Sequence, residues 1–72
     1  MRKKHQTMEL LILPSLSGLI KVHIYGFREQ REWGQVFAEL NGTVVSAKGY
    51  HRKKTIIRTL AKLNESLLNP DH

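Results

Sequence analysis

Four consecutive basic residues, His51 to Lys54, lie where a helix is expected to begin. The first turn of a helix carries unpaired N–H groups and the positive end of the helix dipole, so a cation there costs about 0.3–1 kcal/mol at low salt. Because the chain tolerates Arg52, Lys53 and Lys54 at this place, we expect an anion beside them. Phosphate is a common ligand of helix N-termini and is the first candidate.

The positive charge continues along one side of the predicted helix. At 100° per residue, Arg58 and Lys62 fall on the same side as Lys54, opposite the leucines. Glu65 is the only acidic residue in the helix, so the ion pairs that usually stabilise a solvated helix are nearly absent. We interpret the stripe as a set of contacts to nucleic-acid phosphates, and a solvated helix face is the alternative. The stripe consists of Arg52, Lys53, Lys54, Arg58 and Lys62.

A second candidate surface is the outer face of the expected sheet, away from the helix. Aromatic and basic residues alternate there with core residues, in a pattern that suits base stacking or backbone tracking. The residues are Lys21, His23, Tyr25, Phe37, Lys48 and, if its strand has no bulge, Trp33. Arg28 and Arg31 lie in the charged loop between Tyr25 and Trp33, and they could reach phosphates if the sheet enters a groove of the nucleic acid. In the alternative interpretation, Met8–Leu13 or a dimer partner covers this face and buries its aromatic rings.

Catalytic chemistry has little support in the sequence. The four histidines are scattered, and cysteine is absent. Neither a zinc-protease HExxH motif, nor a Gly-rich phosphate loop, nor a nucleophile elbow is present. We therefore expect no enzymatic activity, no cofactor, no bound metal and no small-molecule substrate.

Size and charge narrow the class of protein. The chain has 72 residues, with 12 Lys and Arg against six Asp and Glu, a net charge of +6 and a pI near 10.1. This is one small domain whose charge favours nucleic acid or another polyanion as the partner. Its modest core makes a homodimer an option. The apolar run Met8–Leu13 is short and interrupted by Glu9, so we expect neither a signal peptide nor a membrane span, and a cytoplasmic location.

Alternation of apolar and polar residues predicts the strands. Leu19–Phe27 shows a period of two. Asn41-Gly42 separates the β-rich segments Trp33–Leu40 and Thr43–Lys48, and this dipeptide predicts a type I′ hairpin because both central residues of that turn need positive φ. Met8–Leu13 is compatible with a strand or a short helical turn.

Apolar residues at steps of three and four predict a helix over Thr55–Leu68, which Asn69-Pro70 ends. The expected fold is α+β: a three-stranded antiparallel meander, four-stranded if Met8–Leu13 pairs, with one C-terminal amphipathic helix packed on one face. Residues 8–69 form the domain, residues 1–7 a mobile basic tail and residues 70–72 a second tail. The expected core is Ile20, Val22, Ile24, Val36, Ala38, Leu40, Val45, Ala47, Ile56, Leu60, Leu63 and Leu67.

The segment from Asn41 to Leu68 resembles the second half of a double-stranded RNA-binding domain. That family ends with a hairpin strand, a Gly-containing loop, a lysine pair and an amphipathic helix, and Gly49, Lys53 and Lys54 fall near the matching places. The resemblance implies that Lys53 and Lys54 touch phosphates flanking a major groove. The chain departs from the family in three ways: the family's third lysine would fall at Ile57, its small alanine would fall at Ile56, and its first helix has no convincing counterpart before Leu19.

Two further resemblances follow from the order of elements. Strand, strand, turn, strand and helix, with Trp and Arg on the sheet, is similar to the arm-binding modules of tyrosine recombinases and to plant-type AP2 domains. This resemblance implies that the sheet enters a DNA groove. The Asn-Gly turn and the tyrosine before the helix are also similar to a small bacterial family of uncharacterised hairpin–helix repeats.

We therefore predict a non-catalytic protein that contacts the phosphates of duplex DNA, or of RNA, through the basic helix stripe. The alternative is a small interaction or inhibitor module, of phage or regulatory type, that docks on an acidic partner. The apolar Met8–Leu13 and the outward Phe37 motivate this alternative.

Overall fold

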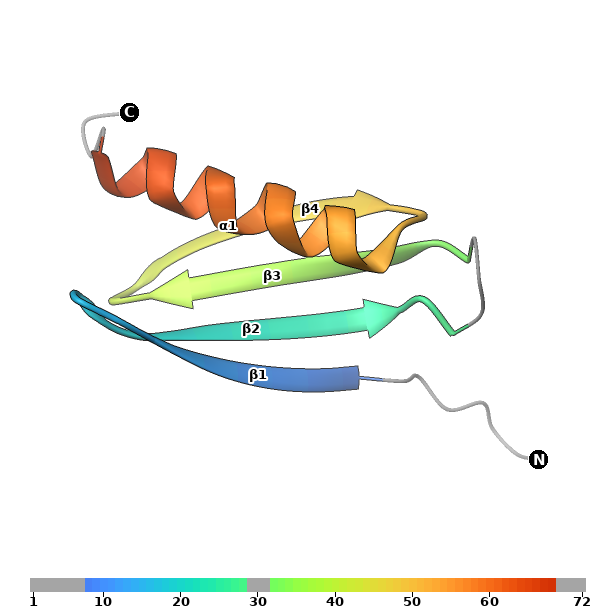
Figure 1. Cartoon of the computed structure of the whole chain (residues 1–72), viewed down its shortest axis with the longest axis horizontal. Coiled ribbons are helices and arrows are strands. Elements are labelled where there is room, and N and C mark those ends of the chain that lie inside the picture. The colour runs from blue at the N-terminus through green and yellow to red at the C-terminus, as the bar shows by residue number, and fades with distance from the viewer. Residues whose placement is uncertain (1–7, 29–31, 69–72) are drawn as a thin grey trace.

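The computed structural model describes residues 8–28 and 32–68, and it contains four strands followed by one helix (Figure 1). The strands form one antiparallel sheet in the order β1-β2-β3-β4, and helix α1 packs against one face of it. The predicted α+β fold with a C-terminal helix is therefore confirmed, with four strands in the meander. The predicted tails at residues 1–7 and 70–72 lie outside the described residues. The elements are β1 (Met8–Ser15), β2 (Gly18–Gly26), β3 (Gly34–Leu40), β4 (Thr43–Gly49) and α1 (Arg52–Leu68).

The turn between β3 and β4 has the geometry that its sequence predicts. Asn41 has φ 51° and Gly42 has φ 87°, and Leu40 pairs with Thr43 across the turn. Positive φ at both central residues is the mark of the type I′ hairpin. The Asn41 side chain also donates a hydrogen bond to the Ser17 carbonyl at 3.1 Å, which ties this turn to the one between β1 and β2.

The ambiguous apolar run near the start of the chain is the strand β1. It pairs antiparallel with β2 from Met8↔Tyr25 to Ser15↔Gly18, and so extends the sheet sideways. The alternative in which this segment folds over the outer face is therefore wrong. Trp33 precedes β3 and stays 46% exposed.

The core lies between the sheet and α1. Its fully buried apolar side chains are Val22, Ile24, Val36, Ala38, Leu40 and Leu63, all of them expected from the sequence. Leu11, Leu13 and Phe27 pack against this core in addition to the expected residues. The assignment of Leu67 to the core is wrong: the backbone of α1 lies close to β3 and β4 and farther from the first two strands, and Leu67 near its end remains 38% exposed.

Helix α1 sits close to the sheet because small residues meet there. Thr55 and Thr59 are completely buried, and their hydroxyls donate to the carbonyls of His51 and Thr55 at 2.6 and 2.7 Å. Gly49 lies beneath Thr55 and belongs to a glycine row, Gly26, Gly34 and Gly49, that pairs across three strands. A Cβ at Gly49 would lie 2.7 Å from Thr55 Oγ1. Gly49 therefore sets how closely the start of α1 approaches the sheet, while the Phe27 ring occupies the space over Gly34.

Candidate nucleic-acid interface

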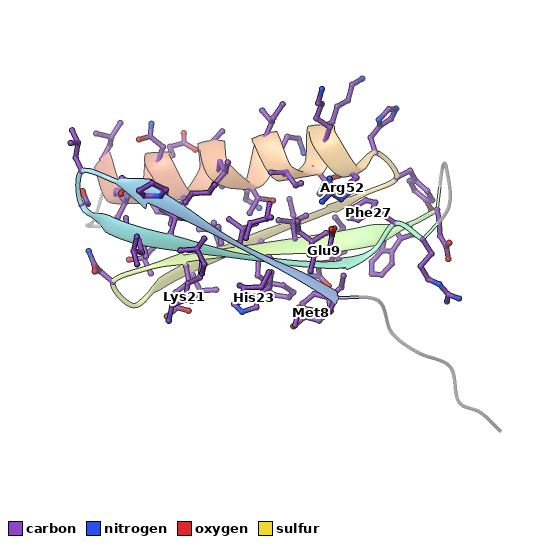
Figure 2. The ribbon with its side chains drawn as sticks, turned by 60° about the horizontal axis from the view of Figure 1, so that its bottom comes forward. Met8, Glu9, Lys21, His23, Phe27 and Arg52 are labelled. Carbon is purple, nitrogen blue, oxygen red and sulfur yellow. The ribbon has the colours of Figure 1, made fainter. Side chains whose placement is uncertain are left out.

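The first turn of α1 contains Arg52, Lys53 and Lys54 and no acidic residue. Its nearest anion comes from the protein itself: the Arg52 guanidinium contacts Glu9 of β1, with Nη2–Oε1 at 2.7 Å and Nε–Oε1 at 3.1 Å (Figure 2). Glu9 thus offsets part of the unfavourable charge at the helix start. Lys53 and Lys54 are exposed and make no ion pair or side-chain hydrogen bond with the described part of the chain.

Two cations of the helix stripe are engaged with the sheet. Arg58 Nη2 donates to the Lys48 carbonyl at 2.6 Å, and Lys62 Nζ donates to the Ser46 carbonyl at 2.6 Å. Both carbonyls belong to β4, the last strand of the sheet. These bonds give Arg58 and Lys62 a structural role that the helical wheel did not reveal. Both side chains remain exposed and charged, but their head groups are already hydrogen-bonded.

The outer face of the sheet is the face opposite α1 (Figure 2). Strand register places Tyr25, Gln35 and Lys48 in one row on this face and His23, Phe37 and Ser46 in the next. The Tyr25 and Phe37 rings meet edge to face, with centroids 5.8 Å apart and planes at 89°. Tyr25 is 36% exposed, so the two central strands present aromatic surface with Lys48 beside it and His23 in the adjacent row. Lys21 follows one row further, opposite Glu39.

Exposed cations and aromatic rings gather at one end of the molecule, which we call the basic end. There β2 and β4 finish and α1 begins, so residues distant in sequence become neighbours (Figure 1). Trp33 and Tyr50 are 46% and 65% exposed. The basic end comprises Arg28, Trp33, Lys48, Tyr50, His51, Lys53 and Lys54. Arg31, a predicted contact residue, lies outside the described residues.

Tyr50 is the candidate that sequence reasoning missed as a contact residue. It occupies the connection between Gly49 and the helix, so neither strand alternation nor helical periodicity assigns it to a face. A large aromatic residue in a short connection between two expected elements was the available signal.

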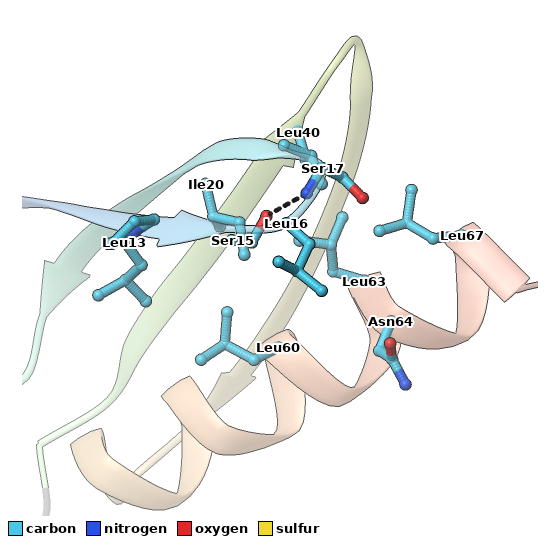
Figure 3. A pocket seen from close by; sticks show the side chains of 11 residues that line it. Leu13, Ser15, Leu16, Ser17, Ile20, Leu40, Leu60, Leu63, Asn64 and Leu67 are labelled. Carbon is cyan, nitrogen blue, oxygen red and sulfur yellow. Dashed lines mark hydrogen bonds between the residues drawn. The ribbon is translucent and has the colours of Figure 1, made fainter.

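A cavity of about 420 Å³ lies between the β1–β2 turn and the second half of α1 (Figure 3). Its walls are mainly aliphatic, including Leu13, Ile20, Leu60 and Leu67, and no charged side chain lines it. The hydroxyl of Ser15 is occupied by the turn: it donates to the Gly18 carbonyl at 2.8 Å and accepts the Ser17 N–H at 3.2 Å. None of the residues that line this cavity has an ionisable side chain.

Within residues 8–28 and 32–68, no three His, Cys, Asp or Glu residues cluster closely enough to hold a metal ion. No helix among these residues is long and apolar enough to cross a membrane. The resemblances to double-stranded RNA-binding, arm-binding and AP2 domains stay predictions, since comparison with family models, with curated proteins and with solved structures finds no match for this chain.

Proposed function

We propose that this protein binds nucleic acid without catalysing a reaction, and that the basic end and the adjoining outer face are its contact surface. The observation that carries the proposal is the gathering of exposed cations and exposed aromatic rings at one end of the fold. Cations bind phosphates, and aromatic side chains stack on bases. The net charge of +6 supports a polyanionic partner.

The arrangement favours a single strand over a duplex. Three of the five stripe cations, Arg52, Arg58 and Lys62, already bond to the protein. The exposed rings of Trp33 and Tyr50 offer stacking surfaces that only unpaired bases can use. The sequence predicts contact with a duplex, and that contact depends mainly on the basic helix stripe. Because most of the stripe already bonds to the protein, we treat duplex binding as the competing outcome of the test.

Fluorescence anisotropy with labelled oligonucleotides tests the proposal. The probes are single-stranded DNA, single-stranded RNA and the matched duplexes, each titrated at several salt concentrations. Four cations at the basic end, Arg28, Lys48, Lys53 and Lys54, predict a slope of log affinity against log salt of about −3 for a single strand. Lys53→Gln with Lys54→Gln should reduce that slope to about −1.4, because two phosphate contacts are lost.

Matched variants separate charge from stacking. Ser17→Asp with Asn64→Asp lowers the net charge by the same two units at exposed positions toward the opposite end, and it should weaken binding less and leave the slope unchanged. Trp33→Ala or Tyr50→Ala should weaken single-strand binding about 5- to 150-fold, which corresponds to about 1–3 kcal/mol per stacked base. Leu68→Ala removes another exposed apolar side chain at the far end of α1 and should leave affinity unchanged.

Three results would count against this assignment. If no probe binds at low salt, the nucleic-acid proposal is wrong. If the lysine variants weaken binding while the aromatic variants do not, and duplexes bind best, the helix-stripe contact predicted from the sequence replaces the single-strand one. If polyglutamate competes as well as the oligonucleotides do, an acidic protein partner is favoured instead.

A further inference from the structure

The two edges of the sheet differ in whether side chains of the helix bond to their backbone groups. At the β4 edge, Arg58 and Lys62 occupy the carbonyls of Lys48 and Ser46. At the β1 edge, no described residue bonds to the outward backbone groups, since the Arg52 contact reaches only the Glu9 side chain. A sheet edge with unpaired N–H and C=O groups is a template for another strand.

The turn between β1 and β2 shows which backbone groups of β1 point outward. Ser15 and Gly18 pair across a two-residue turn, and such a closing pair faces inward, so outward groups alternate from Pro14. Met8, Leu10 and Ile12 therefore direct their N–H and C=O to the open edge. Applied to the β3–β4 hairpin, the same rule directs the Ser46 and Lys48 carbonyls outward, and these are the carbonyls that Lys62 and Arg58 bond.

Strand β1 also lacks the side chains that usually protect an edge. Met8, Leu10 and Ile12 are each about half exposed on the outer face. The strand contains no lysine or arginine, and its one charged residue, Glu9, lies on the helix side and is paired with Arg52. Lysines and unpaired inward-pointing charges are common protections of edge strands against association, but β1 has no lysine and the carboxylate of its inward-pointing Glu9 is paired with Arg52. Proline, another protection, occurs only near the end of β1, at position 14.

We propose that β1 pairs antiparallel with β1 of a second copy, which joins the two sheets into one of eight strands. In one continuous sheet, both copies have their outer faces on the same side. Even-numbered residues of β1 then lie opposite even-numbered residues of the second copy, and odd-numbered residues lie opposite odd-numbered ones. The two-fold axis of the dimer therefore passes between one residue and the same residue of the second copy. An axis at Leu11 pairs all four residues of β1 whose backbone groups point outward, Met8, Leu10, Ile12 and Pro14, whereas an axis at Ile12 leaves Met8 unpaired. The axis at Leu11 sets Leu10 opposite Ile12 of the second copy, so that outward groups meet outward groups.

Antiparallel pairing keeps the like charges of two identical copies apart. Each basic end lies where β1 begins, at Met8, and away from the β1–β2 turn (Figure 1). Antiparallel pairing of β1 therefore places the two basic ends at opposite ends of the dimer. Two chains of net charge +6 thus associate through a strand without any basic residue, while their cation clusters stay apart.

Sedimentation equilibrium over a range of concentrations tests the pairing. The expected species has twice the 8.3 kDa mass of the chain. Ile12→Pro removes one outward N–H without touching the β1–β2 ladder, so it should give a folded monomer. Val44→Pro is the matched control: it removes an outward N–H from the β4 edge and should remain dimeric. Circular dichroism establishes that each variant is folded.

Cross-linking fixes the register, because the chain contains no cysteine. Leu11→Cys places two thiols across the axis in a non-hydrogen-bonded pair, with Cα atoms about 4.5 Å apart, a spacing that a disulfide accepts. Oxidation should convert this variant to a covalent dimer, whereas Val44→Cys should stay uncross-linked. A wild-type protein that is monomeric at all concentrations, or an Ile12→Pro variant that still forms dimers, would overturn the proposal.

Discussion

The contact between Phe27 and Gly34 supports the sharpest test of the packing over the glycine row. Phe27 has φ 54°, and its ring lies against the glycine row, where a Cβ on Gly34 would be 2.3 Å from both Cδ2 and Cε2 of the ring. The third of the three nearest atoms, Cγ at 2.6 Å, belongs to the same ring. Gly34→Ala must therefore displace the ring or shift the strand, and overpacking of this kind costs about 1–3 kcal/mol.

The effect of Gly34→Ala on the free energy of unfolding should change sign when the Phe27 ring is removed. Phe27 is only half-buried, so Phe27→Ala should cost about 2 kcal/mol, less than the 3–5 kcal/mol of a fully buried ring. Gly34 itself has ordinary strand geometry without positive φ. In the Phe27→Ala background, Gly34→Ala should therefore be neutral or stabilise the strand by about 0.5–1 kcal/mol. The coupling free energy between the two sites should be about 2–3 kcal/mol.

Urea unfolding of the wild type, both single variants and the double variant measures this coupling. Far-UV circular dichroism is the suitable signal, because Trp33 is the single tryptophan and lies beside the altered residues. All four proteins are compared at one concentration, since association would shift the midpoint. Additive effects of the two substitutions would refute the reasoning, because they would mean that the Phe27 ring does not occupy the space above Gly34.

Two other perturbations address the charged contacts. Glu9→Gln should lower the free energy of unfolding by about 0.2–1 kcal/mol in dilute buffer, since both side chains of the Arg52 pair are about half exposed, and by nothing at 1 M salt; an equal loss at both salt concentrations in urea titrations would contradict an ion-pair origin. Arg58→Met with Lys62→Met bares the Ser46 and Lys48 carbonyls and should lower stability by about 0.5–1.5 kcal/mol for each lost bond. The exposed β4 edge should then drive assembly beyond the wild-type species in sedimentation velocity, and unchanged sedimentation would show that these bonds do not protect it.

Local patterns in the sequence determined the elements of this fold. Three features depend only on residues that are close together in the sequence: the Asn41-Gly42 turn, the alternation in β2 and the apolar period of α1. Their geometry can therefore be derived from residue spacing alone. The run Met8–Leu13 stayed ambiguous for the same reason: continuous apolar residues carry no period, and only pairing with β2 makes them a strand.

The tertiary structure decided how the charges are used. Glu9 and Arg52 lie 43 positions apart, and no periodicity within β1 or α1 predicts that they meet. The spacing of Arg58 and Lys62 predicts two side chains on the solvent-facing side of a helix. Because α1 lies over β4, both side chains instead donate hydrogen bonds to backbone carbonyls at an edge of the sheet. Tyr50 joins Trp33 and the helix lysines at one end only because the strands bring their ends together. Sequence spacing determines which residues share a face of one element, whereas packing between elements determines which of those faces remain available to a partner.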